Sequence, residues 1–358
     1  MRPTLLLIFS FIISIVGCNK ENRSETGEHV RGSENIEQGA SISLREAAEK
    51  ANILVGAAVF PDGLKNTYYA DTLVRQFNFL TPENHMKWGI VHPTPNKWNF
   101  APADALVGFA IKHNIKIKGH ALIWHRELPK YVDEKMSSEQ FRQAVQEHIH
   151  KLVSHYKGKV YAWDVVNEAI DDKEGLRKTI FLEKLGENYI DEVFRLAHRA
   201  DPDAILIYND YGADGLGSKS DRVYALVKRM VKEDIPIHGV GLQMHISATS
   251  YPKPVDVAAN IRRISELGLK IFISEMDVQI RELSGNLSRR LEVQRQIYHD
   301  IIAESRKVDN FVAVTFWGFT DAHSWIDYEY GPDDPLLFDE DYKPKPAYFG
   351  LLDALTGK

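Results

Sequence analysis

The amino-acid sequence predicts one (β/α)₈ TIM barrel, and two observations favour this fold. From Ile42 onward, short apolar runs alternate with stretches in which apolar residues recur every three or four positions, as expected of alternating strands and helices. The sequence contains eight such runs, which is the number of strands in a TIM barrel. A doubly wound open sheet is the alternative, but it usually has a glycine-rich phosphate loop after its first strand. The segment Gly56-Ala57-Ala58-Val59-Phe60-Pro61 is not such a loop.

Most of the predicted strands are near-continuous apolar runs, which is typical of parallel strands that are covered on both faces. In chain order they are Leu54–Val59, Phe77–Thr81, Ile115–Ile123, Val160–Val166, Ile205–Tyr208, Gly239–Met244, Leu269–Ser274 and Phe311–Phe319. Helical periodicity is clearest in Glu139–Tyr156, Lys219–Lys232, Val255–Leu267 and Leu287–Ser305. In a TIM barrel the active site forms at the carboxyl ends of the strands, so the residues that end these runs become the candidates for function.

The N-terminus predicts export. Leu5–Val16 is an apolar run too short to span a bilayer, as in a secretory signal. Ile15-Val16-Gly17-Cys18 resembles a bacterial lipobox, in which the cysteine is acylated and becomes the mature N-terminus. Cys18 is the only cysteine, so lipidation would explain it, whereas a chance cysteine inside a plain signal peptide is the alternative. We therefore expect a lipid-anchored protein of the bacterial cell envelope.

Three segments are expected. Residues 1–17 form the lipoprotein signal, residues 18–42 form a polar flexible tether, and residues 43–358 form one catalytic domain. The chain is mildly acidic, with 44 Lys and Arg against 50 Asp and Glu. This balance argues against nucleic acid as a partner, since a nucleic-acid-binding protein usually has a clustered basic surface. A neutral substrate and a monomer are expected.

Polar and aromatic side chains gather where the predicted strands end. They include Glu83, Asn84, Lys87, His120, Trp124, His125, Asn167, Glu168, Asn209, Asp210, Gln243, His245, Glu275, Asp277, Trp317 and Trp325. Sugars offer hydroxyl groups for the polar side chains and C–H faces for the indole rings. The set therefore predicts a cleft for a polysaccharide chain.

Seven ordered motifs closely resemble those of glycoside hydrolase family 10, most of whose members are endo-β-1,4-xylanases. They are Glu83–Trp88, Gly119–His125, Trp163–Ala169, Tyr208–Tyr211, Gly239–His245, Ile273–Asp277 and Phe316–Asp321 with Ser324 and Trp325. The resemblance extends from about residue 43 to 356. It implies a TIM barrel, a xylan or xylo-oligosaccharide substrate, and no cofactor.

The resemblance also implies roles for single residues. Glu275 matches the nucleophile, Glu168 matches the acid/base, and Asn167 matches the amide that holds the sugar 2-hydroxyl group. Retaining glycosidases place two such carboxyl groups about 5 Å apart, so that one attacks the anomeric carbon while the other protonates the leaving oxygen. Glu275 must then stay ionised while Glu168 holds a proton.

Other matching positions are expected to support these two glutamates. His245 and Asp277 match residues that hydrogen-bond around the nucleophile, and Asn209 is a further supporting residue. The apolar rings of Trp163 and Trp317 are expected to form a wall that favours protonated Glu168. The positions that match substrate-binding residues are Glu83, Asn84, Lys87, His120, Trp124, Asn167, Gln243, His245, Trp317 and Trp325.

Three positions depart from the family pattern. Glu127 stands where many members have Gln, Tyr131 where many have Trp, and Gly212 where Asn is frequent. Glu127 would place a charge beside a glycone subsite, where it would act on a sugar two residues from the cleavage point.

The sequence is compatible with three alternatives to a xylanase. One is a retaining β-1,4-glucanase on the same scaffold, because xylose and glucose differ chiefly by a hydroxymethyl group. A second is a surface lipoprotein that binds xylan without cutting it. The third is a metal-dependent barrel hydrolase that uses His120, His125 and His245. It is disfavoured because Leu54–Phe60 lacks the usual His-x-His pair. No metal is expected.

The backbone near Glu168 is also predicted to be irregular. Successive side chains of a strand point to opposite faces, so a regular strand would turn Asn167 away from the side of Glu168. The family roles require both side chains to reach the sugar. We therefore expect the strand to turn or widen at Asn167 and Glu168.

Overall fold

The structure is a computed structural model, and it describes residues 42–358. The predicted signal, Cys18 and almost all of the tether lie outside the described residues. Within residues 42–358, none of the helices has both the length and the apolar character needed to cross a bilayer.

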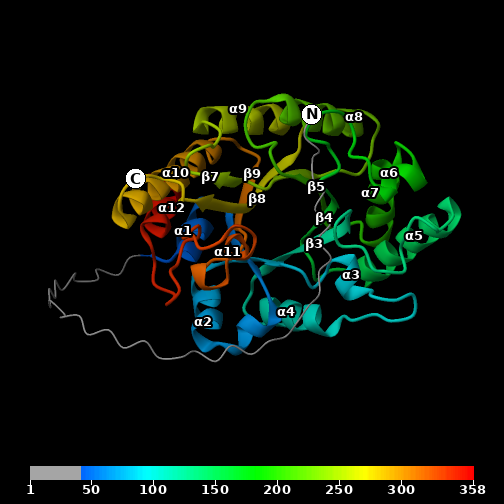
Figure 1. Cartoon of the computed structure of the whole chain (residues 1–358), viewed down its shortest axis with the longest axis horizontal. Helices are drawn as coiled ribbons and strands as arrows, with labels where there is room; N and C mark the ends of the chain where they lie inside the picture. Colours follow the sequence, from blue (N-terminus) through cyan, green and yellow to red (C-terminus); the bar gives the residue numbers. More distant parts are fainter. Residues whose placement is uncertain (1–41) are drawn as a thin grey trace, which may run out of the picture. The chain divides into compact units, whose positions relative to one another are not determined.

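Parallel strands form the inside of the domain, and the helices surround them (Figure 1). The strands are β1 Leu54–Val59, β2 Phe79–Pro82, β3 Lys116–Trp124, β4 Ala162–Asn167, β5 Ile205–Asp210, β6 Gly239–Leu242, β7 His245–Ser247, β8 Lys270–Gln279 and β9 Phe311–Phe316. Each of β1 to β5 pairs with the next strand, β1 also pairs with β9, and β9 pairs with β8. The pairing of β6 with β8 closes the circle, which confirms the predicted (β/α)₈ barrel.

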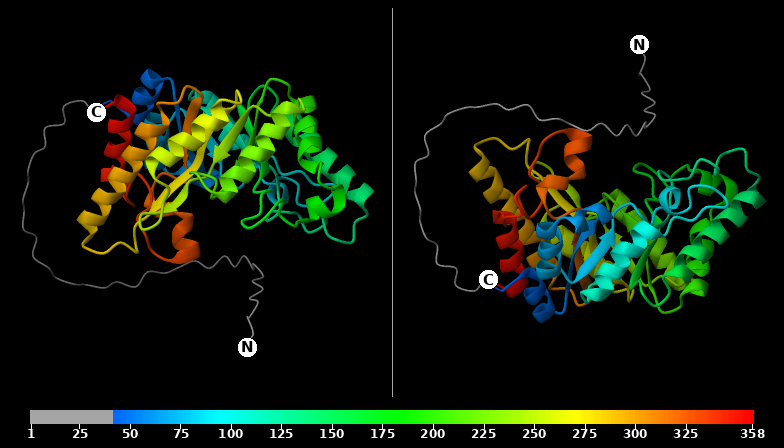
Figure 2. Two further views of the ribbon diagram at one scale, coloured as in Figure 1. Left: turned by 90° about the horizontal axis from the view of Figure 1, so that it is seen from above. Right: turned by 90° about the horizontal axis from the view of Figure 1, so that it is seen from below.

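The helices follow the strands in the expected alternation. They are α1 Leu44–Ala51, α2 Thr67–Gln76, α3 Trp88–Val91, α4 Ala101–Lys112, α5 Ser138–His155, α6 Ile180–Leu185, α7 Tyr189–Ala200, α8 Ser218–Lys232, α9 Pro254–Ser265, α10 Leu287–Ser305, α11 Trp325–Tyr330 and α12 Pro346–Thr356, with 3₁₀ turns η1 Pro61–Lys65 and η2 Asp321–His323. Serine capping boxes begin α1 and α5, because the Ser43 and Ser137 side chains accept from the first-turn backbone. The short helix α11 projects from one end of the barrel (Figure 2).

Two predicted strands differ from those observed. The predicted strand Gly239–Met244 is interrupted, because Met244 has a left-handed backbone with φ +62° and β7 begins after it. The predicted strand Leu269–Ser274 is too short, since β8 continues to Gln279 by pairing with β7. Glu275 therefore lies within a strand rather than at its end. The other strands begin and end within three residues of their predicted bounds.

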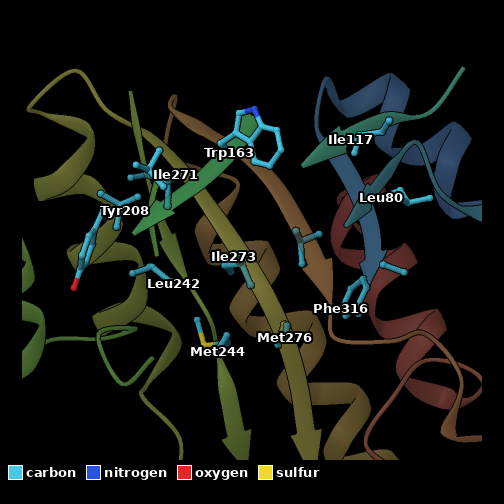
Figure 3. Close-up of a cluster of buried hydrophobic side chains, with 14 of the residues drawn as sticks. Leu80, Ile117, Trp163, Tyr208, Leu242, Met244, Ile271, Ile273, Met276 and Phe316 are labelled. Atoms are coloured by element: carbon cyan, nitrogen blue, oxygen red, sulfur yellow. The ribbon is translucent and has the colours of Figure 1, made fainter. Parts of the chain in front are cut away.

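Apolar side chains fill the barrel and the layer beneath the helices. Inside the barrel, Phe79 of β2 and Phe272 of β8 approach each other with ring centroids 6.5 Å apart. These two strands are not neighbours in the sheet, so the rings meet across the interior. Figure 3 shows part of the larger cluster, including Ile271 and Ile273. This packing holds the strand ends at fixed positions.

One close approach inside the sheet requires glycine. Gly119 on β3 is paired in register with Trp163 on β4, and a Cβ atom at Gly119 would lie only 2.2 Å from the buried indole ring. Trp163 is therefore a core residue. The expectation that its ring forms a wall beside Glu168 is wrong, since the ring packs over Gly119 and is fully buried.

Replacing Gly119 with alanine should lower the free energy of unfolding by about 2 kcal/mol or more, because the indole ring or the strand must move. Urea unfolding followed by circular dichroism measures the change. Gly108→Ala on α4 is the matched control, since its Cβ would meet nothing within 4 Å. In a helix this substitution should stabilise by up to about 1 kcal/mol. Equal stability of the two variants would contradict the packing argument.

Candidate active site

A cleft of about 550 Å³ opens at the carboxyl ends of the strands. Every residue that the sequence assigned to catalysis or sugar binding lines it, namely Glu83, Asn84, Lys87, His120, Trp124, Asn167, Glu168, Gln243, His245, Glu275, Trp317 and Trp325. Residues of β3, β4, β7 and β8, and of segments that follow the strands, thus meet at one place, although they are far apart in the chain. Asn209 and Asp277 are fully buried and contact the lining residues from below.

Two amides connect the two buried glutamates. Asn209 Nδ2 donates to Glu275 Oε1 at 2.6 Å and to Asn167 Oδ1 at 2.8 Å. Asn167 Nδ2 in turn donates to Glu168 Oε1 at 3.2 Å, and Gln243 Nε2 donates to the same oxygen at 3.2 Å. The positions of the two carboxyl groups are therefore fixed relative to each other by neutral hydrogen bonds.

The backbone leaves the strand at Glu168. This residue has φ +58°, in the left-handed region that non-glycine residues rarely adopt. Just before it, the register between β4 and β5 shifts within residues 164–166. These irregularities let both Asn167 and Glu168 present their side chains to the cleft. The predicted turn at these two residues is confirmed.

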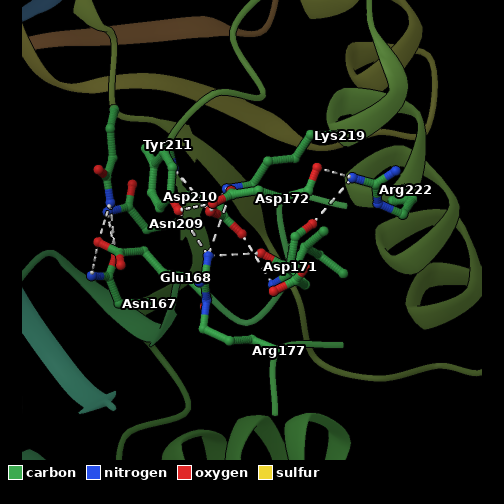
Figure 4. Close-up of polar contacts among 12 residues, drawn as sticks. Asn167, Glu168, Asp171, Asp172, Arg177, Asn209, Asp210, Tyr211, Lys219 and Arg222 are labelled. Atoms are coloured by element: carbon green, nitrogen blue, oxygen red, sulfur yellow. Dashed lines mark hydrogen bonds and ion pairs between the residues drawn. The ribbon is translucent and has the colours of Figure 1, made fainter. Parts of the chain in front are cut away.

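Arg177 holds this turn from the protein side (Figure 4). Its Nε donates to the carbonyl oxygen of Glu168 at 3.0 Å, and its Nη2 donates to that of Ile170 at 3.2 Å. The backbone N–H of Arg177 donates to the Ala169 carbonyl at 2.7 Å, while the Ile170 N–H donates to the Tyr208 hydroxyl at 3.1 Å. The strained conformation of Glu168 is thus stabilised by bonds to three successive residues.

The same arginine continues the network toward the cleft wall. Arg177 Nη2 donates to the Tyr211 hydroxyl at 2.9 Å, and that hydroxyl donates to Asp172 Oδ2 at 2.6 Å. Lys219 Nζ lies 3.3 Å from the centroid of the Tyr211 ring and pairs with Asp172 at 2.7 Å and Asp210 at 3.1 Å (Figure 4). These contacts hold Tyr211, which lines the cleft, in a fixed orientation.

Glu275 has a strongly cationic surrounding. Its burial would raise the pKa, but the charge of His120, the hydrogen bond and charge of His245, and the charge of Lys118 outweigh burial and lower the pKa of Glu275 to about 2. His245 Nε2 lies 3.3 Å from Glu275 Oε2, and His120 Nδ1 lies 3.9 Å from Oε1. Glu275 is therefore ionised at any pH near neutrality.

Asp277 orients the histidine that contacts Glu275. Asp277 Oδ2 lies 2.8 Å from His245 Nδ1 and accepts a hydrogen bond from Trp325 Nε1, also at 2.8 Å. Burial works against a charge on His245, but Asp277 and Glu275 together hold the pKa of His245 well above its ordinary value. A cationic imidazolium at this position helps to keep Glu275 ionised.

The donor set at the barrel centre does not favour a metal ion. His120, Asp164 and Glu275 offer ligand atoms within 4.8 Å of one another. However, the fully buried Lys118 ammonium already pairs with Asp164, and His120 Nδ1 lies 2.8 Å from the same carboxylate. A divalent cation placed there would have to overcome repulsion from the ammonium group.

A second polar group lies beyond β2. Lys87 Nζ donates to Asn84 Oδ1 at 2.7 Å and lies 4.8 Å from the centroid of the Trp124 ring. Asn84 Nδ2 donates to Glu83 Oε1 at 3.2 Å. Burial raises the pKa of the Glu83 carboxyl group although Lys87 and Asn84 oppose that shift. The centroid of the Trp317 ring lies 5.9 Å from Lys87 Nζ. Together these residues offer hydrogen bonds and apolar faces to a sugar.

Comparisons with known proteins identify this arrangement. Residues 43–354 match the model of "Glycosyl hydrolase family 10". The chain belongs to glycosyl hydrolase family 10. Two relatives are each 39% identical and cover 88% of this chain and 92% of their own: "Endo-1,4-beta-xylanase B" of Thermotoga neapolitana and "Beta-1,4-xylanase" of Dictyoglomus thermophilum. Crystalline xylanase 10B of Thermotoga petrophila RKU-1 in complex with xylobiose is also 39% identical, with a TM-score of 0.85 over 88% of this chain and 98% of that one.

Several lining residues of this family 10 barrel were not predicted from the sequence. They are Arg126, Tyr211, Gln279, Glu329 and Tyr330. Arg126 and Tyr211 lie on segments that follow strands, whereas Glu329 and Tyr330 lie on the short helix α11, and no local pattern in the sequence showed that these side chains face the cleft. For Gln279 the signal was present, since it continues the alternation of β8 beyond Glu275 and Asp277.

The departures at residues 127 and 131 lie beside the cleft rather than in its lining. The Tyr131 hydroxyl accepts from Trp88 Nε1 at 3.1 Å and lies 2.9 Å from His92 Nδ1. Burial raises the pKa of Tyr131 to about 12, so this hydroxyl stays neutral. Burial lowers the pKa of Lys87, and the nearby glutamates, Glu127 among them, oppose this shift.

Replacing His245 with glutamine should raise the pKa of Glu275, because the imidazolium charge is lost while burial remains. The acidic limb of the kcat/KM profile should move upward by about one pH unit or more. Steady-state rates across the acidic range measure this shift. His299→Gln is the control, since that ring contacts Asp300 on α10 away from the cleft. An unmoved limb in His245→Gln would show that Glu275 does not depend on the histidine.

Proposed function

We propose that the protein is an endo-β-1,4-xylanase that hydrolyses internal xylosidic bonds of xylan with retention of anomeric configuration. The observation that carries this proposal is the pair of buried carboxyl groups, Glu168 and Glu275, joined by amides in one cleft but placed in opposite surroundings. Retaining glycosidases require such a difference, because one carboxyl group must be ionised while the other carries a proton.

The surroundings of Glu168 contrast with those of Glu275. Within residues 42–358, no lysine, arginine or histidine forms a hydrogen bond or ion pair with the Glu168 carboxyl group. Among these residues, its hydrogen-bond donors are the neutral side-chain amides of Asn167 and Gln243. A carboxyl group that lacks a cationic partner is suited to hold a proton and release it on demand.

The proposed reaction has two steps. In the first, a Glu275 oxygen attacks the anomeric carbon while the Glu168 proton passes to the leaving glycosidic oxygen, so a glycosyl ester forms and the C–O bond breaks. In the second, ionised Glu168 takes a proton from water, and the water oxygen attacks the anomeric carbon and releases Glu275. Asn167, fixed by Asn209, is placed to hold the 2-hydroxyl group of the reacting sugar.

The substrate assignment draws on the relatives. Two of them are called xylanases, and the Thermotoga petrophila protein was crystallised with xylobiose. Hydrogen-bonding side chains and tryptophan rings around the cleft suit a neutral sugar chain. A β-1,4-glucanase remains the competing assignment, and "Exoglucanase XynX" of Acetivibrio thermocellus is 35% identical over 84% of this chain.

Early hydrolysis of xylan by the purified protein, followed by proton NMR, should give the β-anomer first. A first-formed α-anomer would contradict a retaining mechanism. Glu168→Gln and Glu275→Gln should each lower kcat on xylan by about 10²-fold or more, since each removes a group that takes part in bond breaking. Glu266→Gln, at an exposed position just after α9, is the matched control.

Two comparisons separate the alternatives. A higher rate on carboxymethylcellulose than on xylan would favour the glucanase. Binding of xylan without release of reducing ends would favour the non-catalytic lipoprotein.

We further propose that the protein is anchored to the bacterial cell envelope through acylated Cys18. Cys18 lies outside the described residues, so the support is the lipobox-like Ile15–Cys18 and the absence of any other cysteine in the sequence. An acyl chain on the mature N-terminus would tether the barrel through residues 18–42.

Cells grown with radiolabelled palmitate should yield a labelled protein, and Cys18→Ala should remain unlabelled. Equal labelling of both proteins, or labelling of neither, would remove the anchor from the proposal.

A further inference from the structure

Arg126 lies at the cleft with an unusually free side chain. It follows Trp124 by two positions, is exposed, and lines the cleft, with its guanidinium carbon 6.0 Å from the centroid of the Trp124 ring. Within the part of the chain that the structure describes, Arg126 forms no hydrogen bond and no ion pair. Its five N–H donors therefore remain available to a ligand.

Three other cationic side chains near the cleft are engaged by protein partners. Lys87 donates to Asn84, Lys219 pairs with two aspartates, and Arg177 is bound to the turn at Glu168. Each of these side chains has a positioning role that explains its charge. Arg126 differs, because among residues 42–358 its guanidinium forms no hydrogen bond or ion pair and only lies beside the Trp124 ring in the cleft wall.

We propose that Arg126 binds the carboxylate of a uronic acid side group attached to the xylan backbone, such as a glucuronate. This inference rests on the proposed xylan substrate and extends it to an acidic, decorated class. A sugar ring lying against Trp124 would bring its ring substituents within reach of a guanidinium at this distance. The planar fork of arginine matches a carboxylate in a bidentate manner, which neutral sugar hydroxyl groups do not require.

A small free anion fits this position less well. The same cleft contains the carboxyl groups of Glu83, Glu275 and Glu329, which repel an unattached anion that enters it. A uronate that is part of a neutral chain is different. The backbone sugars would supply most of the binding energy, and the attached carboxylate would only have to reach the Arg126 guanidinium.

The test compares two xylo-oligosaccharides of equal length, one linear and one carrying a single glucuronate, as a ratio of kcat/KM values. Arg126→Gln should lower the acidic-to-linear ratio by about three- to fivefold, the range expected for an exposed charge pair. Arg126→Lys should give a ratio between those of the wild-type protein and Arg126→Gln, because lysine keeps the charge but loses the bidentate fork. About 0.5 M NaCl should lower the ratio of the wild-type protein but leave that of Arg126→Gln nearly unchanged.

Arg262→Gln is the matched control, since it removes one positive charge from an exposed position on α9. It should leave the ratio unchanged. An equal loss on both substrates in Arg126→Gln would show that Arg126 contacts the backbone, and an unchanged ratio would show that it contacts neither part. Either result would overturn the inference.

Failure of the proposed xylanase function gives a different pattern. In that case the wild-type protein cuts neither oligosaccharide. Calorimetric binding of the same pair to the wild-type protein and to Arg126→Gln then decides the inference. Preferential binding of the acidic compound that disappears in Arg126→Gln supports it, and equal binding of both compounds contradicts it.

Discussion

The side-chain amide of Asn209 is the contact on which the site depends. It donates to Glu275 and to Asn167, while its own oxygen accepts from Ser274 Oγ at 2.6 Å, so the buried group has a partner at each end. Satisfaction of this kind is what makes a buried polar network stabilising. The network also needs space, because a Cβ atom at Gly241 would lie 2.1 Å from the Asn209 oxygen. A glycine on β6 thus determines the position of the proposed nucleophile on β8.

The two glutamates are held in different ways. Glu275 lies in the middle of β8, whose neighbours β6 and β9 also close the barrel. Glu168 lies on a left-handed turn that Arg177 holds through backbone carbonyl groups. The first position is fixed by the sheet itself, whereas the second is fixed by side-chain contacts outside the sheet. Electrostatics follows the same division, because cations surround Glu275 and amides surround Glu168.

The strands and the cleft residues could largely be predicted from the sequence, because apolar runs define the barrel and parallel strands all end at the same side. The turn at Glu168 was also predictable, since period-two alternation conflicted with the family roles. The position of Trp163 could not be predicted from the sequence. A tryptophan in an all-apolar strand can face the core or the cleft, and the small partner Gly119 that accommodates it is identified only by the strand register.

Three further features were beyond local patterns. The extension of β8 depends on pairing with β7. β7 begins directly after Met244, which has a left-handed backbone conformation. Arg126 and Tyr211 lie on connecting segments whose direction is set by tertiary contacts. The lack of a hydrogen bond or ion pair at Arg126 among the described residues is likewise a property of the three-dimensional structure, which no local sequence pattern indicates.

The contrast between the strand and the turn bears on how such a barrel can diverge. Substitutions that displace Glu275 would also disturb the pairing of β8 with β6 and β9, so selection for a folded protein already protects that position. The segment after Glu168 contributes to no barrel strand, and its aspartates and arginine can be exchanged without opening the sheet. The barrel fold therefore constrains the surroundings of the proposed acid/base and the wall at Tyr211 less than it constrains the position of the proposed nucleophile.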